Sequence, residues 1–111
     1  MKLITTLGIL FFSSPLFSQT VFSVANDYQA DVKVFVVQND YQADLKVYKV
    51  KYDYQATGNK GLWFFTQNDY QAKQSIYFVK NDYQADLKIF YVEYDYQAGW
   101  VNSSKQHLIQ Q

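Results

Sequence analysis

The tetrapeptide Asp-Tyr-Gln-Ala occurs six times in this chain of 111 residues. Successive copies begin 13, 13, 16, 13 and 13 residues apart. Their first residues are Asp27, Asp40, Asp53, Asp69, Asp82 and Asp95. A unit this short cannot bury an apolar face by itself, so the copies are expected to stack on or wind around one another and share one core.

Each unit has the pattern of one turn followed by one strand. In the clearest copy, at residues 39–51, Asn-Asp-Tyr-Gln contains strong turn formers, and the following Asp-Leu-Lys-Val-Tyr-Lys-Val alternates polar with branched or aromatic residues. The apolar residues do not recur at spacings of three and four residues along the sequence, which argues against a helix. Leu45 and Val47 fall on one face of the strand, whereas Tyr48 falls on the other. Apolar residues on both faces indicate a strand that is bent, bulged or held between two layers.

The six units form a duplicated triplet, because each tetrapeptide of the first half recurs 42 residues later. Even the irregularities match, since Tyr52 and Tyr94 both replace the Asn that opens the other copies. Three extra residues, 57–59, fall at the midpoint, where a longer turn is expected. The predicted fold is all-β, with two pseudo-twofold-related triplets that either wind around each other or form a short unknotted β-solenoid.

The N-terminus has the pattern of a secretory signal peptide at residues 1–18. A lysine precedes the apolar run Leu3 to Phe12, a proline breaks the run, and Ser18 supplies a small residue at the expected cleavage site. No later stretch is long and apolar enough to anchor the chain in a membrane. We therefore expect an exported protein, periplasmic or extracellular, with one domain at 19–101 and a polar C-terminal tail at 102–111.

Composition narrows the class of function further. The chain has no cysteine, so its stability has to come from packing and topology, and an aromatic content of 20% supplies large rings for a core. Ten basic and ten acidic residues give a formal net charge of zero. This balance argues against a nucleic-acid binder or a protein that binds anionic membranes, because both usually carry a basic excess.

The units also carry a family resemblance in combination with two further segments. With Gly-Asn-Lys-Gly-Leu-Trp-Phe-Phe at residues 58–65 and Tyr-Gln-Ala-Gly-Trp at residues 96–100, the repeats resemble the septoil-knot domain, a family of small bacterial proteins. The resemblance spans about Val21 to Trp100. It implies two strands of chain braided into a deep knot with seven crossings, and it implies no activity, because the family's biochemical role is unassigned.

The recurring Asp, Tyr and Gln are interpreted as structural residues of the turns. Carboxylates suit turn closure by accepting backbone hydrogen bonds, amides suit an internal ladder that joins equivalent turns, and tyrosine rings suit packing between turns. Besides the six aspartates given above, the residues are Tyr28, Gln29, Tyr41, Gln42, Tyr54, Gln55, Tyr70, Gln71, Tyr83, Gln84, Tyr96 and Gln97.

Two alternatives assign these turns to ligands. Exposed tyrosines would stack on sugar rings, and Asp31, Asp44 and Asp86 create an Asp-x-x-x-Asp spacing that suits calcium. The glycines of known calcium-binding turns are missing here, which favours the structural interpretation of the aspartates. No metal ligand set is predicted.

Trp63 and Trp100 lie outside the repeat and follow the two third copies of the tetrapeptide. Packing at the ends of the braid is the favoured interpretation, and a ligand-facing aromatic pair is the alternative. The single histidine, His107, lies in the polar tail. Phosphate loops, zinc spacings and nucleophile elbows are absent from the sequence, so no catalytic residue and no cofactor is predicted.

These observations predict a non-catalytic, exported β-repeat domain that serves as a structural, adhesive or binding module and is selected for slow unfolding. A module that binds glycan or calcium is the first alternative. A hydrolase that uses two carboxylates is the second, since acidic residues are plentiful. The partner is unknown from the sequence, which is compatible with a glycan or a protein, and the oligomeric state does not follow from it either.

Overall fold

The computed structural model describes residues 19–109, so the predicted signal peptide lies outside the described residues. Strands and short 3-10 helices alternate along this part of the chain, with one strand and one turn per repeat as predicted. The strands are β1 (Thr20–Ser23), β2 (Val32–Val36), β3 (Leu45–Lys49), β4 (Leu62–Phe65), β5 (Gln74–Phe78), β6 (Leu87–Tyr91) and β7 (Gly99–Trp100).

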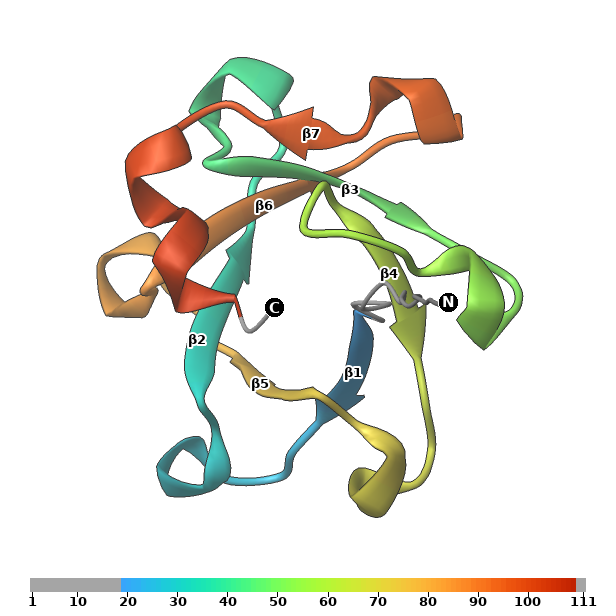
Figure 1. Cartoon of the computed structure of the whole chain (residues 1–111). Coiled ribbons are helices and arrows are strands. Elements are labelled where there is room, and N and C mark those ends of the chain that lie inside the picture. The colour runs from blue at the N-terminus through green and yellow to red at the C-terminus, as the bar shows by residue number, and fades with distance from the viewer. Residues whose placement is uncertain (1–18, 110–111) are drawn as a thin grey trace, which may run out of the picture.

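Every Asp-Tyr-Gln forms a single turn of 3-10 helix. Within the first turn, the backbone N–H of Ala30 donates to the carbonyl of Asp27 at 3.1 Å, and the other five copies repeat this bond. The turns project outward around the molecule (Figure 1). They are η2 (Asp27–Gln29), η3 (Asp40–Gln42), η4 (Asp53–Gln55), η5 (Asp69–Gln71), η6 (Asp82–Gln84) and η7 (Asp95–Gln97), and a longer 3-10 segment, η8 (Ser103–Leu108), follows β7.

The six longer strands close into a ring in which the two triplets alternate. The order is β4-β1-β5-β2-β6-β3, and an additional pairing of β3 with β4 closes it. All of these pairings are parallel, whereas β7 lies antiparallel to the first part of β3. The strands before the midpoint, β1, β2 and β3, form the first triplet of strands, and β4, β5 and β6 form the second, so each strand of the first has both ring neighbours in the second. The two halves of the chain are therefore interleaved, as the interwound fold predicts, and the closed ring differs from the open-ended stack of a solenoid.

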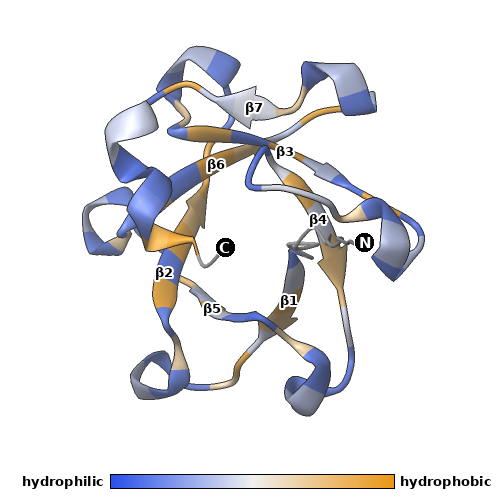
Figure 2. Cartoon of the chain, in the orientation of Figure 1, coloured by the Kyte–Doolittle hydropathy of each residue, from blue (hydrophilic) through white to orange (hydrophobic). Residues whose placement is uncertain are grey.

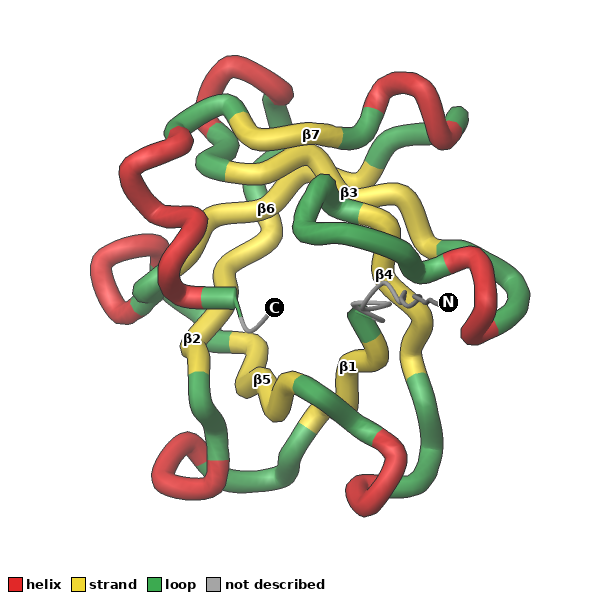
Figure 3. The backbone as a smooth tube through the Cα atoms, in the orientation of Figure 1, coloured by secondary structure: helices red, strands yellow, loops and turns green. Residues whose placement is uncertain are grey.

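Consecutive strands of a triplet are separated in the ring by a strand of the other triplet. β1 and β2, for example, lie on the two sides of β5, and residues 24–31 connect them. A parallel pair needs a crossover connection, which is usually an α-helix. Here the crossover is a loop and one turn of 3-10 helix, and Figure 3 shows these connections on the outside of the ring of strands.

The core fills the inside of the ring. Successive residues of a strand point to opposite faces, so that Leu45 and Val47 are buried while Lys46 between them is half-buried on the outer wall. Figure 2 shows the hydrophobic residues gathered on the strands. The buried core residues are Val21, Val32, Val34, Leu45, Val47, Trp63, Ile76, Leu87, Ile89 and Ile109.

The C-terminal segment packs against the ring. Ile109 is 2% exposed and belongs to the core, although it falls within the polar C-terminal tail predicted at 102–111. Lys105 holds the segment in place, because its ammonium group donates to the carbonyl of Asp86 at 2.9 Å and lies 3.6 Å from the Asp44 carboxylate. The domain therefore extends at least to Ile109.

Two glycines of the midpoint connection, which is residues 56–61 between η4 and β4, provide a test of the packing before β4. Gly61 has a φ of +88° and Gly58 has a φ of +70°, so alanine at either position is strained by about 1–2 kcal/mol. A Cβ at Gly61 would also overlap the backbone carbonyl of Lys46, whereas one at Gly58 would meet only the flexible Lys60 side chain.

We therefore expect Gly61→Ala to lower the free energy of unfolding by about 1–3 kcal/mol more than Gly58→Ala does. Urea unfolding followed by circular dichroism measures both variants, with Gly58→Ala as the matched control. Equal losses would mean that the backbone of β3 yields to the added methyl group without cost.

Candidate binding grooves on the outer wall

The six tyrosines of the tetrapeptides point into solvent. Their exposed fractions lie between 72% and 82%, so the expected packing of these rings between turns is wrong. The six are Tyr28, Tyr41, Tyr54, Tyr70, Tyr83 and Tyr96. Two of them stack on the tyrosine that replaces Asn, since the ring centroids of Tyr52 and Tyr54, and those of Tyr94 and Tyr96, are 5.5 Å apart. The repeat therefore displays aromatic surface without using it for the core.

The six glutamines bond within their own turns, so the expected ladder between turns is also wrong. In four turns Oε1 accepts the backbone N–H of the residue three positions earlier, as Gln97 does from Tyr94 at 3.0 Å. Gln42 and Gln71 accept the side-chain amide of the preceding Asn instead. The arrangement in the first four turns is a form of the capping box with Asn or Tyr at its first position, and the spacing of three to Gln is the sequence signal that identifies it.

The aspartates fall into two sets with different surroundings. Those that precede a strand each accept the backbone N–H of a residue in the neighbouring strand, which strengthens the start of that strand. The bonds are Asp31 to Ser75 at 3.0 Å, Asp44 to Lys88 at 2.9 Å and Asp86 to Lys33 at 3.0 Å. Residues 19–109 contain no group of three or more His, Cys, Asp or Glu side chains that could hold a metal ion.

The aspartates that open the tetrapeptides are exposed, and their carboxylates have no hydrogen-bond or ion-pair partner among the described residues. They therefore remain available to a ligand. Three of them, Asp27, Asp40 and Asp82, lie in hollows of the outer wall.

A lysine and an aromatic residue face each other across three neighbouring strand pairs. In each pair the two side chains lie at the same register on the outer face of the ring, and all six are half-buried. The pairs are Lys33 with Tyr77, Lys88 with Phe35, and Lys46 with Phe90. The ring thus carries a repeated basic and aromatic motif on the face opposite its core.

Each of these pairs lines one of three similar grooves. A groove has an Asp and a Lys from one repeat, the aromatic residue and strand end of a second, and the Gln of the turn that follows. The cavity volumes are about 340 Å³ at β2–β5, 420 Å³ at β2–β6 and 430 Å³ at β3–β6. Volumes of this size are typical of small-molecule sites.

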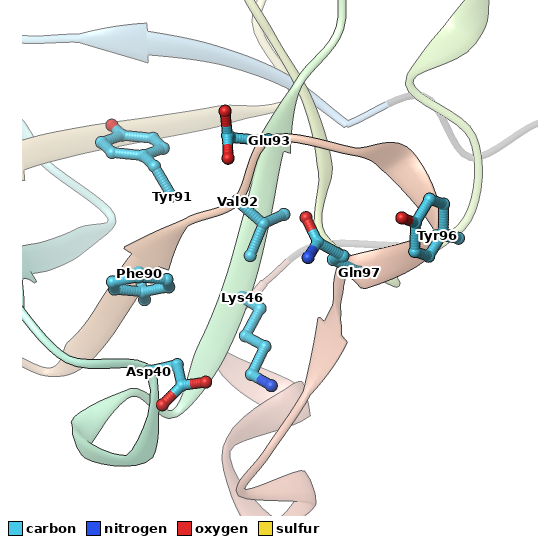
Figure 4. Close-up of a pocket in the computed structure, with 8 residues that line it drawn as sticks. All are labelled: Asp40, Lys46, Phe90, Tyr91, Val92, Glu93, Tyr96 and Gln97. Carbon is cyan, nitrogen blue, oxygen red and sulfur yellow. The ribbon is translucent and has the colours of Figure 1, made fainter.

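Figure 4 shows the groove at β3–β6, which we use as the example. Asp40 and Lys46 direct their polar ends toward each other, with Phe90 on the side of Asp40 and with Val92 and Gln97 next to each other on the side of Lys46. No ion pair joins this Asp to this Lys, since the one ion pair within residues 19–109 is that of Lys105 with Asp44. Burial raises the pKa of Tyr91, which also lines this groove, to about 12, so its hydroxyl is neutral at physiological pH.

The three grooves share a set of unpaired charges. Lys33, Lys46 and Lys88 are half-buried, and their ammonium groups make no hydrogen bond or ion pair with the described residues. Each therefore presents a donor beside an unpaired carboxylate and an aromatic ring. Sequence reasoning missed these lysines, although the signal was present as Lys-x-aromatic at equal positions of three repeats.

The two tryptophans have structural surroundings. Trp63 is completely buried in the core, so its interpretation as a ligand-facing ring is wrong. Trp100 is half-buried against the core, and its indole N–H donates to the carbonyl of Asn59 at 2.9 Å. Trp100 thereby connects β7 to the midpoint connection, which contains Asn59.

His107 lies in η8, with its Nδ1 3.1 Å from the carbonyl of Ser104, and it takes no part in the three grooves. Within residues 19–109, no helix is long and apolar enough to cross a membrane.

A family model described as the 7(1) septoil knot domain matches residues 18–101. Neither a curated protein nor a solved structure matches the chain significantly. The family match covers the six strands of the ring, β7 and all three grooves.

Proposed function

The chain belongs to the septoil knot domain family, and on this premise we propose that it is a non-catalytic, exported binding module whose three outer-wall grooves bind glycans. One observation carries the proposal: an unpaired carboxylate, an unpaired ammonium group and a half-buried ring recur together in three grooves of one chain. The core and the strand pairing do not require this recurrence.

The chemistry of the groove favours a sugar. A pyranose has an apolar face of C–H groups that packs on an aromatic ring, and its hydroxyl groups both donate and accept hydrogen bonds. In the groove at β2–β6, the carboxylate of Asp82 would accept from hydroxyl groups, and the ammonium of Lys88 would donate to them, beside the ring of Phe35. The exposed tyrosines of the neighbouring turns extend this surface with rigid, amphipathic rings.

A binding role is favoured over hydrolysis because the grooves at β2–β5 and β2–β6 each contain one carboxylate, from Asp27 and Asp82. Hydrolysis of a glycosidic bond usually requires two. The third groove contains two carboxylates, those of Asp40 and Glu93, and is therefore the one of the three where hydrolysis has to be tested. The proposal predicts that an oligosaccharide bound in this groove is released unchanged.

The interleaved ring supports an extracellular role for such a module. Each ring strand is paired on both sides, so no strand leaves the ring unless at least two pairings break. A protein with this property is expected to unfold slowly, which protects it where proteases are abundant. The export signal predicted at residues 1–18 fits the same environment.

The binding prediction is tested by removing the three groove charges while retaining the apolar stems of the side chains. We expect the triple variant Lys33→Met, Lys46→Met, Lys88→Met to lose at least tenfold in affinity for oligosaccharides that the natural chain selects from a glycan array. Isothermal titration measures the affinity and the stoichiometry, which is expected to exceed one per chain.

A second triple variant, Lys51→Met, Lys60→Met, Lys73→Met, removes the same charge from positions that line none of the three grooves and serves as the matched control. Equal affinity loss in both variants would assign the effect to net charge. An array without any enriched glycan would contradict the proposed function itself.

A further inference from the structure

The three grooves differ at one repeated position. The last residue of the repeat that supplies the aromatic ring lines every groove, and it is a different residue each time. It is Lys80 at β2–β5, Gln38 at β2–β6 and Glu93 at β3–β6. All three side chains are exposed, and none makes a hydrogen bond or ion pair with the described residues.

This position sets the formal charge of each groove. The groove at β2–β5 contains one carboxylate and two ammonium groups, so its charge is +1. The groove at β2–β6 contains one of each and is neutral. The groove at β3–β6 contains two carboxylates and one ammonium group, so its charge is −1. One chain therefore presents three similar sites that differ in the sign of their charge.

We infer that the three grooves are selective subsites, in which the last residue of the repeat determines the charge of the sugar unit that is accepted. This inference rests on the proposed glycan binding. Lys80 favours a unit that carries a carboxylate or sulfate, Gln38 a neutral unit, and Glu93 a unit that carries an ammonium group, because each charge attracts its opposite and repels its like. The partner is a glycan that contains both charged and neutral units.

The neighbouring charges agree with this assignment. Lys33 adds a second donor to the groove of Lys80, so an anionic unit there would meet two ammonium groups. Asp40 adds a second carboxylate to the groove of Glu93, and the two together exceed the single charge of Lys46. The Asp, Lys and aromatic residue that recur in all three grooves therefore provide contacts for any sugar. The last residue of the repeat, which differs between the grooves, decides between sugars.

The test reverses the variable charges one at a time. Lys80→Glu is expected to lower the affinity for a sulfated oligosaccharide about tenfold and to leave that for a glucosamine oligosaccharide unchanged. Glu93→Lys is expected to lower the affinity for the glucosamine oligosaccharide about tenfold and to leave that for the sulfated probe unchanged. Both variants should bind a neutral oligosaccharide as the natural chain does. Lys60→Glu, outside these grooves, is the control for net charge.

Nuclear magnetic resonance titrations complete the test by assigning each probe to a groove. Resonances of Lys33 and Tyr77 are expected to shift with the sulfated probe, and those of Lys46 and Phe90 with the glucosamine probe. If the natural chain binds the probes but the charge reversals leave their relative affinities unchanged, the charge selectivity is wrong and the proposed function stands. If none of the three probes binds although the array selects other glycans, the charge selectivity is wrong, and if the array selects none either, both are wrong.

Discussion

The two triplets, expressed separately as residues 19–58 and 59–109, are expected to remain unfolded. All pairings of the structure join strands of different triplets, so neither half contains two strands that pair with each other. Isolated strands have no independent stability in water. Far-UV circular dichroism and the dispersion of amide resonances measure the outcome for each half.

Two controls separate the effect of division from the effect of a missing covalent link. The intact chain of residues 19–109 should fold under the same conditions. An intact chain with a protease site at residues 57–59, folded first and then cut, should keep its spectrum, because the cut leaves every strand pairing in place. A dispersed spectrum from either half alone would contradict the interleaved ring.

The second large effect is expected at Trp63, the largest completely buried side chain of the described residues. Replacement of Trp63 with alanine removes an entire indole from the core and should lower the free energy of unfolding by about 3–5 kcal/mol. A small domain has about 5–15 kcal/mol in total, so the variant would be close to unfolding at 37 °C. Chemical unfolding followed by circular dichroism measures this loss.

Two further variants identify its origin. Tyr70→Ala deletes a ring that is 81% exposed and should change stability by less than about 0.5 kcal/mol. Trp63→Phe keeps most of the apolar volume and removes an indole N–H that has no hydrogen-bond partner among the described residues, so it should cost much less than alanine. Similar losses for Trp63→Ala and Tyr70→Ala would mean that burial in the ring contributes little.

Much of the architecture could be predicted from the repeat alone. The length of the unit, its division into turn and strand, and the duplicated triplet all follow from spacing and from turn formers such as Asn39 and Asp40. The order of strands could not be read in the same way, because parallel neighbours come from distant repeats and turn chemistry marks only contacts that are local in sequence. The family resemblance supplied the interwinding, and the pairings agree with it.

The direction of the turn side chains could not be inferred from their recurrence. Gln29 recurs because it caps its own turn, whereas Tyr28 recurs while 82% exposed, so repetition alone does not distinguish a structural residue from a displayed one. The grooves were missed for another reason. Asp82, Lys88 and Phe35 meet only after two repeats have been placed beside each other, and no local pattern records that contact.

Ring closure has a consequence for how molecules of this protein meet one another. An aromatic-rich chain with no net charge lacks the electrostatic repulsion that keeps proteins apart in concentrated solution. Open sheets of such composition recruit further strands at their margins and grow into fibres. Here each of the six ring strands already has a partner on both sides, and the one open edge among the described strands is that of the two-residue β7, so a second molecule finds little template for β-addition. Crowding of this protein at a surface should therefore bring tyrosines into contact without nucleating amyloid.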